Sequence, residues 1–306
     1  MAPTLPSTPT APFGRVLTAM VTPFTEDGKV DVEGAQRLAA HLVEHGHDGL
    51  VVSGTTGESP TTTDEEQLAV LRAVLEAVGD RAHVVAGVGT NDTAHSIEKA
   101  RAAAAAGAHA LLVVTPYYNK PPQEGLLAHF SSVADATDRP VMLYDIPGRS
   151  GVAIATETLV RLAEHDRILA VKDAKGDFFA TSWVMARTDL AVYSGDDALN
   201  LGWLAHGAAG IVSVVGHVAG PQYAAMVRAV GEGDLATAQR IHRELLPAVR
   251  GIMTVTQGAI MVKAALHLQG LLSSPAVRLP LVEATPDQVA ALRRDLEQAA
   301  LLEAPA

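Results

Sequence analysis

Eight short runs rich in valine, isoleucine and leucine recur along the chain, and each is followed by a stretch with helical character. The runs cover residues 16–22, 49–53, 83–88, 110–115, 141–146, 168–173, 190–194 and 210–215. Continuous apolar strands that alternate with helices are typical of a parallel sheet covered on its outer face. Eight such units predict an α/β fold of the TIM (β/α)8 barrel class.

A doubly wound sheet is the alternative for the same alternation of strands and helices. It would place a glycine-rich phosphate-binding turn after the first strand. Here that turn reads Thr22-Pro23-Phe24-Thr25 and contains no glycine. The sequence therefore favours the closed barrel.

The chain divides into three predicted parts. Residues 1–13 carry regularly spaced prolines and lack the basic start and apolar centre of a signal peptide, which predicts a disordered tail. The barrel is expected to span residues 14–231. Residues 232–306 read as further helices that a minimal barrel does not require, so we expect a C-terminal helical region packed on the barrel or on a neighbouring subunit.

Two helix starts are marked by capping boxes. Thr63 is followed by Glu66 ahead of apolar residues at helical spacing, and Thr285 is followed by Gln288 with a proline at the first helical position. These patterns predict helices that begin at residues 64 and 286. The second of these helices is expected to run to about residue 302.

Charge and cysteine content exclude several classes of function. The 23 basic and 34 acidic residues give a net charge of −11, which argues against nucleic acid or an anionic membrane as the main partner. The chain has no cysteine, which excludes disulfides, a thiolate nucleophile and cysteine-bound metals. The absence of cysteine fits a reducing cytoplasm. Apolar runs are interrupted within about 10 residues, so no membrane span is expected.

Lys172 closes the apolar run 168–171, so an amine stands where a buried strand should end. A buried ammonium is costly unless it is paired or gives up its proton, and a neutral amine is the form that attacks a ketone. The alternative is a lysine that reaches from the strand end to solvent. Because catalytic groups of such barrels gather where the strands end, the polar residues after the other runs decide between the two readings.

The neighbouring fifth run carries Tyr144 near its carboxyl end, where the phenol could meet the Lys172 amine inside the barrel and relay protons. Arg149 follows in a loop flanked by proline and glycine, where a guanidinium can hold a carboxylate by two hydrogen bonds. The second run is followed by Gly54-Thr55-Thr56-Gly57-Glu58, whose amides and hydroxyls suit a carboxylate or an oxyanion; an ordinary capping loop is the alternative.

Other polar groups have simpler interpretations. Asp196 and Asp197 suggest Mg²⁺ but are expected to cap the next helix. The histidines have spacing that suits zinc, yet on an outer helix we expect them to face solvent; they are His41, His45 and His47. We predict no metal site. Lys263, in apolar company within the C-terminal region, is not assigned a catalytic role.

The sequence resembles the dihydrodipicolinate synthase (4-hydroxy-tetrahydrodipicolinate synthase) family of class I pyruvate aldolases, and in its detail the actinobacterial members. The motifs that carry this resemblance are Gly54-Thr55-Thr56-Gly57-Glu58, Tyr117-Tyr118-Asn119, Tyr144-Asp145-Ile146-Pro147-Gly148-Arg149 and Val171-Lys172-Asp173. It extends from about residue 14 to the C-terminal helices. It implies a cofactor-free condensation of pyruvate with L-aspartate 4-semialdehyde in the diaminopimelate/lysine pathway, by a homotetramer that is a dimer of dimers.

The resemblance also implies a catalytic set. Lys172 would form a Schiff base with the ketone of pyruvate, and Tyr144 would shuttle protons during imine formation and cyclisation. Thr55 would link Tyr144 to Tyr118, which in this family enters the site from the neighbouring subunit. Tyr118 in a rigid loop is also consistent with simple packing at a subunit contact.

Four further residues are expected around the substrates. Thr56 would hold the carboxylate of pyruvate, and the backbone at Val212 would complete that pocket. Arg149 would bind the carboxylate of the semialdehyde, and Gly195 would lie beside the bound substrates. These roles come from the resemblance alone.

Feedback inhibition by lysine is predicted to be weak or absent. Three residues of the family's effector site at the subunit interface are present, namely Ser59, Asn91 and Tyr117. Others are replaced relative to the sensitive members of the family; the replacements are Pro60, Asp64, Gln67 and His95.

Two alternatives to this function stay open at the sequence level. Another class I pyruvate lyase, acting on N-acetylneuraminate or a 2-keto-3-deoxy sugar acid, would share Lys172 and Tyr144 but would not need Arg149. A catalytically silent paralogue acting as a binding protein is the second alternative. The joint presence of Lys172, Tyr144, Thr55 and Tyr118 argues against that second alternative.

Overall fold

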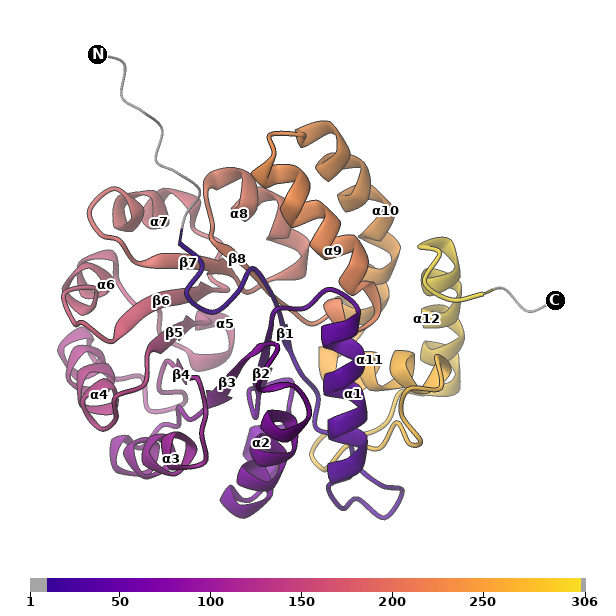
Figure 1. The fold of residues 1–306 in the computed structure, drawn as a ribbon, viewed down its shortest axis with the longest axis horizontal. Coiled ribbons are helices and arrows are strands. Elements are labelled where there is room, and N and C mark those ends of the chain that lie inside the picture. Colours follow the sequence, from indigo (N-terminus) through magenta and orange to yellow (C-terminus); the bar gives the residue numbers. More distant parts are fainter. Residues whose placement is uncertain (1–9, 304–306) are drawn as a thin grey trace.

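The computed structural model describes residues 10–303. Its eight strands form one closed parallel barrel in sequential order, as Figure 1 shows. The strands are β1 (Val16–Ala19), β2 (Gly49–Val52), β3 (His83–Gly87), β4 (Ala110–Val114), β5 (Val141–Asp145), β6 (Ile168–Asp173), β7 (Ala191–Ser194) and β8 (Gly210–Ser213). The predicted TIM barrel is confirmed.

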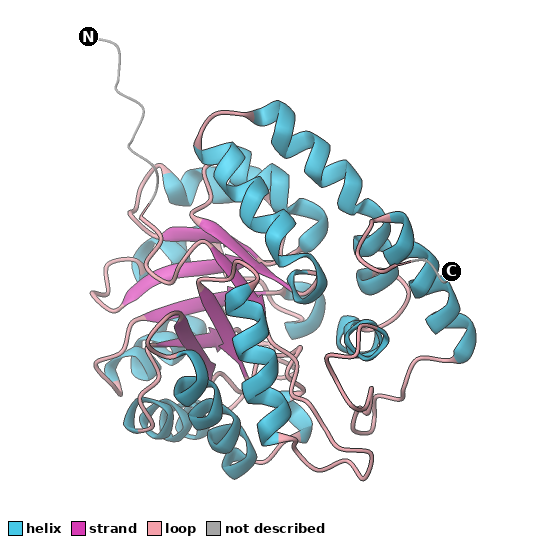
Figure 2. Ribbon diagram, turned by 45° about the vertical axis from the view of Figure 1, so that its right-hand side comes forward, coloured by secondary structure: helices cyan, strands magenta, loops and turns pink. Residues whose placement is uncertain are grey.

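Helices surround this barrel and continue beyond it (Figure 2). They are α1 (Val32–Glu44), η1 (Ser59–Thr61), α2 (Asp64–Val78), α3 (Thr93–Ala105), α4 (Gln123–Asp135), α5 (Pro147–Ser150), α6 (Thr156–Leu162), α7 (Phe178–Met185), η2 (Asp197–Leu199), α8 (Asn200–His206), α9 (Gly216–Gly231), α10 (Leu235–Met253), α11 (Gly258–Leu268) and α12 (Pro286–Gln298). Both predicted capping boxes are formed, at the starts of α2 and α12. The last helix ends at Gln298, earlier than expected.

Two strands, β1 and β8, end more than one residue earlier than the apolar runs suggested. In both cases a side chain accepts the hydrogen bond of a backbone amide that follows the strand. After β1, the Val21 amide donates to His217 Nε2 at 3.1 Å. After β8, the amides of Val214 and Val215 donate to Asp197 Oδ2 at 2.8 and 2.9 Å. The apolar residues continue because these segments stay largely buried, although they have left the sheet.

The core has two layers, because each strand is covered on both faces. One apolar cluster fills the inside of the barrel and includes Leu17, Val51 and Met142. A larger cluster lies between the strands and the helices and includes Leu50, Leu111 and residues of the C-terminal helices. Burial on both faces is the reason that the strands read as continuous apolar runs.

Phe13 closes the inside of the barrel ahead of the first strand. It is fully buried, its ring centroid lies 6.2 Å from that of Tyr193, and its amide donates to the Tyr193 hydroxyl at 3.2 Å. The expected tail of residues 1–13 therefore does not extend to Phe13, because an aromatic side chain there fills the barrel interior. Residues 1–9 lie outside the described part of the chain.

The C-terminal helices pack directly on the barrel side. Helix α10 packs on α9 and α12, and α11 packs on α9. Helix α9 ends at Gly231, but the larger cluster continues into α10, α11 and α12, so the division at residue 231 stays a prediction.

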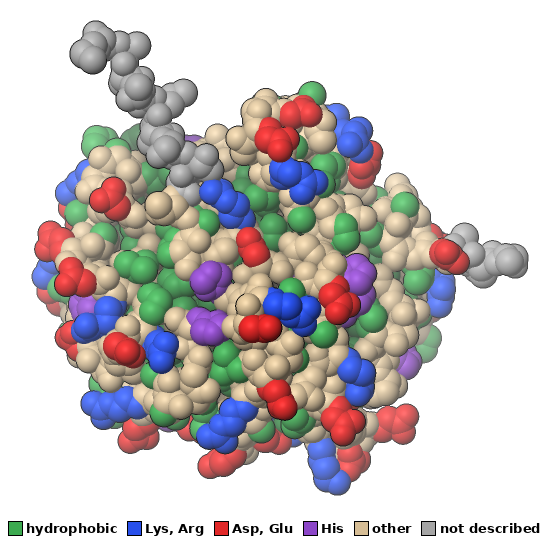
Figure 3. Space-filling model, in the orientation of Figure 1, with side chains coloured by type: hydrophobic (Ala, Val, Ile, Leu, Met, Phe, Trp, Pro, Cys, Tyr) green, Lys and Arg blue, Asp and Glu red, His purple; other side chains and the backbone are tan. Residues whose placement is uncertain are grey.

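Charge and hydropathy of the described residues give two observations on possible partners. On the face shown in Figure 3, acidic and basic side chains are interspersed. Among residues 10–303 no single helix is long and apolar enough to cross a membrane, although α10 and α11, bent by 112°, pass a test of length and composition as a pair.

Replacing Phe13 by alanine tests whether its side chain fills the barrel interior ahead of β1. We expect Phe13→Ala to lower the free energy of unfolding by about 3–5 kcal/mol, because it empties a fully buried aromatic site. Thr10→Ala, at an exposed position, should stay within about 0.5 kcal/mol of the parent. Urea unfolding at one fixed protein concentration measures both. Equal stability of the two variants would contradict this packing.

Candidate active site

The structure brings Tyr144 and Lys172 together at the carboxyl ends of β5 and β6. The two residues are register partners in neighbouring parallel strands, and both side chains lie on the inner face. The Lys172 Nζ atom lies 4.1 Å from the centroid of the Tyr144 ring. The side chain does not reach solvent, since Lys172 is only 4% exposed. The alternative of a solvent-directed lysine is therefore wrong.

Burial shifts the pKa of the Lys172 amine. Loss of hydration lowers this pKa to about 8, the carboxylate of Asp197 acts in the opposite direction, and Arg149 adds to the lowering. At pH 7 about one amine in ten is then neutral, against fewer than about one in a thousand for an ordinary lysine. The site thus holds a supply of unprotonated nucleophile near neutral pH.

Tyr144 keeps its proton in the same surroundings. Burial raises the pKa of its phenol to about 12, Arg149 lowers it and Asp196 raises it. A neutral phenol can donate one hydrogen bond while it accepts another, so it can pass a proton on as it receives one, which suits a relay next to an amine. The geometry therefore supplies a nucleophile and a proton carrier side by side.

A cavity of about 340 Å³ opens beside Tyr144. Its walls include Thr55 from the β2 loop, Tyr117 from the β4 loop, and Ile146 and Arg149 after β5. Lys172 is not itself a lining residue, because its amine lies against the ring of Tyr144. A molecule in this cavity would meet the exposed guanidinium of Arg149, carried by the short helix α5.

The loop after β2 is held from several sides. Ser53 and Glu58 both have φ of 55°, in the left-handed region, and the Glu58 amide donates to the Thr55 carbonyl at 3.1 Å. The Thr22 hydroxyl donates to the Gly57 carbonyl at 2.7 Å. Thr55 reaches the cavity, whereas Thr56 is 9% exposed and is not part of its wall.

Gly195 and Val212 lie on the Lys172 side of the site. A Cβ atom on Gly195 would stand 2.9 Å from Lys172 Cγ and 3.0 Å from its Cε, so only glycine leaves the lysine side chain its room. Val212 on β8 is buried in the same inner cluster as Tyr144. Both predicted residues therefore lie within the barrel end that holds the amine.

Tyr118 is placed away from this chain's own cavity. It is 89% exposed and has φ of 73°, while its neighbour Tyr117 lines the cavity wall. A large aromatic side chain that projects from a rigid loop has no partner within the described chain to cover it. Its predicted role in the neighbouring subunit stays a prediction.

Carboxylates that directly follow the strands hold the surrounding loops. Asp173 accepts hydrogen bonds from the amides of Lys175 and Gly176, each at 2.9 Å. Asp196 caps η2, as predicted, but Asp197 is buried and instead accepts bonds from the β8 loop and from Asn200. The signal for Asp197 was its place after a strand; its partner loop was not visible in the sequence.

Asp145 and Lys175 form an ion pair that sequence reasoning missed. The distance from Lys175 Nζ to Asp145 Oδ2 is 3.3 Å, and burial raises the pKa of the Asp145 carboxyl to about 6. These residues follow Tyr144 and Lys172 closely in sequence. The pair therefore ties the end of β5 to the loop after β6, next to Tyr144 and Lys172.

The three candidate zinc histidines do not behave alike. His41 and His45 stack with ring centroids 3.9 Å apart, but His47 is buried and bonds the Leu42 carbonyl through Nδ1 at 2.8 Å. Burial lowers the pKa of His47 to about 4. The expectation that His47 faces solvent is therefore wrong, because the chain turns inward after α1. Within residues 10–303 no group of three or more His, Cys, Asp or Glu side chains is arranged to hold a metal ion.

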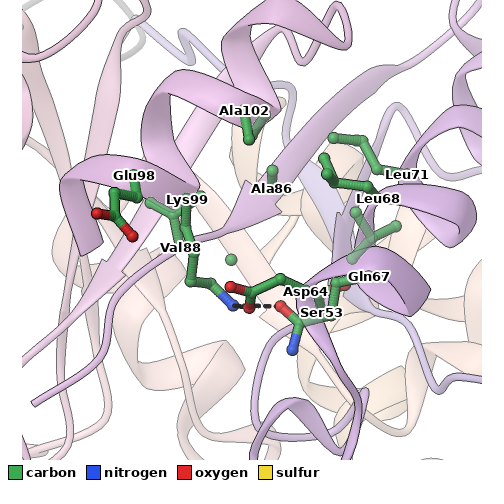
Figure 4. A pocket seen from close by; sticks show the side chains of 13 residues that line it. Ser53, Asp64, Gln67, Leu68, Leu71, Ala86, Val88, Glu98, Lys99 and Ala102 are labelled. Carbon is green, nitrogen blue, oxygen red and sulfur yellow. Dashed lines mark hydrogen bonds and ion pairs between the residues drawn. The ribbon is translucent and has the colours of Figure 1, made fainter. Parts of the chain in front are cut away.

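A second cavity of about 160 Å³ lies between α2 and α3, and Figure 4 shows its polar end. Lys99 there contacts both Gln67 and Asp64, and His95 Nε2 lies 2.7 Å from Asp64 Oδ2. Of the positions predicted to be replaced in the effector site, Asp64 and His95 therefore bind each other, and Gln67 is joined to Asp64 through Lys99.

A parallel eight-stranded barrel with an inward, desolvated lysine beside a tyrosine at its carboxyl end defines an enzyme of the class I aldolase type. Residues 12–299 match the model of the dihydrodipicolinate synthetase family. The chain belongs to that family, as predicted.

Two relatives of high sequence identity are both named 4-hydroxy-tetrahydrodipicolinate synthase. A 4-hydroxy-tetrahydrodipicolinate synthase of Kineococcus radiotolerans is 71% identical over 97% of this chain and 96% of its own. The corresponding synthase 2 of Streptomyces coelicolor is 65% identical over 97% of this chain and 98% of its own. These actinobacterial relatives confirm the predicted lyase and its place in lysine and diaminopimelate synthesis.

Solved structures of the family superpose closely. The enzyme from Cyanidioschyzon merolae with lysine bound has a TM-score of 0.92 and 42% identity, covering 96% of this chain and 100% of its own. The chloride-inhibited enzyme from Acinetobacter baumannii complexed with pyruvate has a TM-score of 0.91 and 35% identity, covering 95% of this chain and 100% of its own.

The shifted pKa of Lys172 can be measured directly. We expect the rate at which a small amine-reactive electrophile labels Lys172 to rise with pH and to reach half its maximum near pH 8, because burial favours the neutral form of the amine. Lys29, exposed and paired with Asp27, has a raised pKa and serves as the internal control. Peptide mass spectrometry after competitive labelling gives both curves. The same midpoint for the two lysines would contradict the desolvated site.

Proposed function

We propose that this chain condenses pyruvate with L-aspartate 4-semialdehyde through a Schiff base on Lys172, giving 4-hydroxy-tetrahydrodipicolinate. The observation that carries this proposal is the buried Lys172 amine, with a pKa of about 8, packed against Tyr144. Pyruvate as a substrate is supported by the family and by the pyruvate complex of the Acinetobacter relative.

The first half of the reaction makes a carbon nucleophile. The neutral Lys172 amine adds to the ketone carbon of pyruvate, and water leaves as the iminium forms. The positive nitrogen acidifies the adjacent methyl group, which loses a proton to give an enamine. Tyr144 carries protons to the departing oxygen and between the intermediates, a role worth about 10²- to 10⁴-fold in rate.

The second half joins the two substrates and frees the enzyme. The enamine carbon attacks the aldehyde carbon of the semialdehyde, and the aldehyde oxygen takes up a proton. The amino group of the semialdehyde then adds to the iminium carbon and displaces the Lys172 amine, so that a ring closes around a new carbon–nitrogen double bond. The only small molecule released is the water lost when the iminium formed.

Carboxylate binding sets the orientation of both partners. Arg149 faces the cavity and is placed to hold the carboxylate of the semialdehyde in a two-pronged contact. Thr56 and the backbone at Val212 hold the carboxylate of pyruvate, with Gly195 beside it. An acidic aldehyde is the partner that makes use of Arg149, which favours this reaction over the sugar-acid lyases. Activity with the semialdehyde against activity with sugar acids separates these functions.

The active assembly is proposed to be a cytoplasmic homotetramer built as a dimer of dimers. Tyr118 is exposed, whereas the adjacent Tyr117 lines the cavity of its own chain. A second subunit packed against this loop would therefore receive Tyr118 at its own site, while Tyr117 stays at the site of the first subunit. Thr55 would then connect Tyr144 to the Tyr118 of the neighbouring subunit.

Borohydride trapping tests the proposed chemistry. With pyruvate present, reduction should fix one pyruvate per chain on Lys172, located by peptide mass, and Lys172→Ala should abolish both the adduct and condensation. Lys29→Ala, which removes an exposed amine, should trap like the parent. An adduct on another lysine, or none in the parent chain, would disprove the mechanism. No adduct in a folded parent would instead support the silent paralogue.

A mixing experiment tests the shared site. Tyr118→Phe should lower kcat by about 10²- to 10⁴-fold if the phenol relays protons. Subunits carrying Lys172→Ala and Tyr118→Phe should regain activity when mixed and reassembled, because a hybrid interface contains one complete site. The control is each variant reassembled alone. Absence of recovery in hybrids shown by mass to have formed would place Tyr118 outside the neighbouring site.

Lysine is expected to inhibit weakly or not at all. Asp64 binds His95 and Lys99, and Lys99 also binds Gln67, so these side chains are already engaged within the chain. Pro60 has no backbone N–H to donate. Initial rates at millimolar L-lysine should stay close to those without it. Strong inhibition would show that the replaced residues still form an effector site.

A further inference from the structure

A buried ion pair joins the C-terminal helices to the loop that follows β2. Lys263 of α11 is fully buried, and its Nζ atom lies 2.5 Å from Glu58 Oε1 and 2.8 Å from the Ala276 carbonyl oxygen. Glu58 is itself buried at the end of the turn that begins at Gly54. None of the reaction steps uses either charge, although both are withdrawn from water.

The second oxygen of Glu58 is also held from the C-terminal region. The backbone amide of Arg278 donates to Glu58 Oε2 at 2.9 Å. The Arg278 guanidinium pairs with Glu66 at the start of α2, with Nη2 at 2.6 Å from Oε1. Phe24 packs against both cations, since Lys263 Nζ lies 3.9 Å and Arg278 Cζ 4.6 Å from its ring centroid. Both carboxylate oxygens are therefore fixed by residues more than two hundred positions away.

The conformation of Glu58 needs such support. Its φ of 55° lies in the left-handed region, which is uncommon for glutamate and persists where the surroundings hold it. The Glu58 amide donates to the carbonyl of Thr55, and the Ser59 amide to that of Gly54, at 3.1 and 3.3 Å. A displacement of Glu58 is therefore passed through one tight turn to the residue that lines the cavity.

Stability alone does not account for a pair of this kind. The loss of hydration of two buried charges offsets much of their attraction, so a buried ion pair is a weak source of folding free energy. Burial lowers the pKa of Lys263 to about 8, with Glu58 opposing the shift, which shows how far the amine has been removed from water. What the pair supplies instead is a directional tie between two distant segments.

We propose that Glu58 and Lys263 are positioning residues for the reaction, and that their ion pair holds the β2 turn so that Thr55 and Thr56 stand correctly toward Tyr144 and the pyruvate carboxylate. This inference rests on the proposed function, because it uses the roles assigned there to the two threonines. It gives the C-terminal helices a part in catalysis without placing any of their residues in the cavity.

Two variants separate positioning from folding. Lys263→Met leaves the buried Glu58 carboxyl without its cation, whereas the double variant Glu58→Gln/Lys263→Met removes both members of the ion pair. The double variant should recover most of the thermal midpoint that Lys263→Met loses. Its kcat/KM for pyruvate should nevertheless stay roughly 10- to 100-fold below that of the parent, mainly through KM, because the turn has lost its tie. Borohydride with saturating pyruvate should still label Lys172.

The matched control is Asp295→Asn, which breaks the ion pair of Asp295 with Arg250 between α10 and α12. It should lower the thermal midpoint but leave kcat and KM per folded chain unchanged. If neither Lys263 variant folds, Glu58→Gln carries the same comparison, because Lys263 can then release its proton.

Wild-type kcat and KM in the folded double variant, or in Glu58→Gln, would overturn the inference. An equal change of KM in Asp295→Asn would also overturn it, because the effect would then come from general loosening of the C-terminal helices. Failure of the parent chain to trap pyruvate is a different result and counts against the proposed function.

Discussion

The exclusion of water from the Lys172 amine is the constraint on which the rest of the structure depends. An inward position at the end of a parallel strand, covered by the ring of Tyr144, lowers the pKa of the amine to about 8. Asp197 opposes the shift and keeps it moderate. The same carboxylate binds the loop after β8, so Asp197 both holds that loop and limits the lowering of the Lys172 pKa that burial causes.

The sequence was sufficient for the elements whose signals are local. Strand runs, capping boxes and the pairing of Tyr144 with Lys172 all follow from periodicity and from the order of neighbouring strands. Phe13 and His47 were misread because their burial depends on partners far along the chain. Phe13 is fixed by Tyr193 across the barrel, and His47 is enclosed where the chain passes beneath α9.

Other features lie beyond what one linear pattern can show. The Glu58–Lys263 pair joins positions 205 residues apart, and only the apolar surroundings of Lys263 hinted that its amine is buried. Tyr118 has the opposite difficulty, because its signal is clear but a single chain offers it no cavity. The motifs thus pointed to residues that the structure brings to one end of the barrel, such as Thr55, Tyr144 and Arg149, whereas the tertiary contacts that hold them could be found only in the structure.

A loop on a barrel is not fixed by the strand that precedes it. The β2 turn has residues of left-handed conformation at both ends, Ser53 and Glu58, and only a few backbone hydrogen bonds join its own residues to one another. It is held from the β1 side by Thr22 and from the C-terminal region by Lys263 and Arg278. The C-terminal region, which a minimal barrel does not require, thus contributes contacts that hold the β2 turn beside the strand end that carries the Lys172 amine.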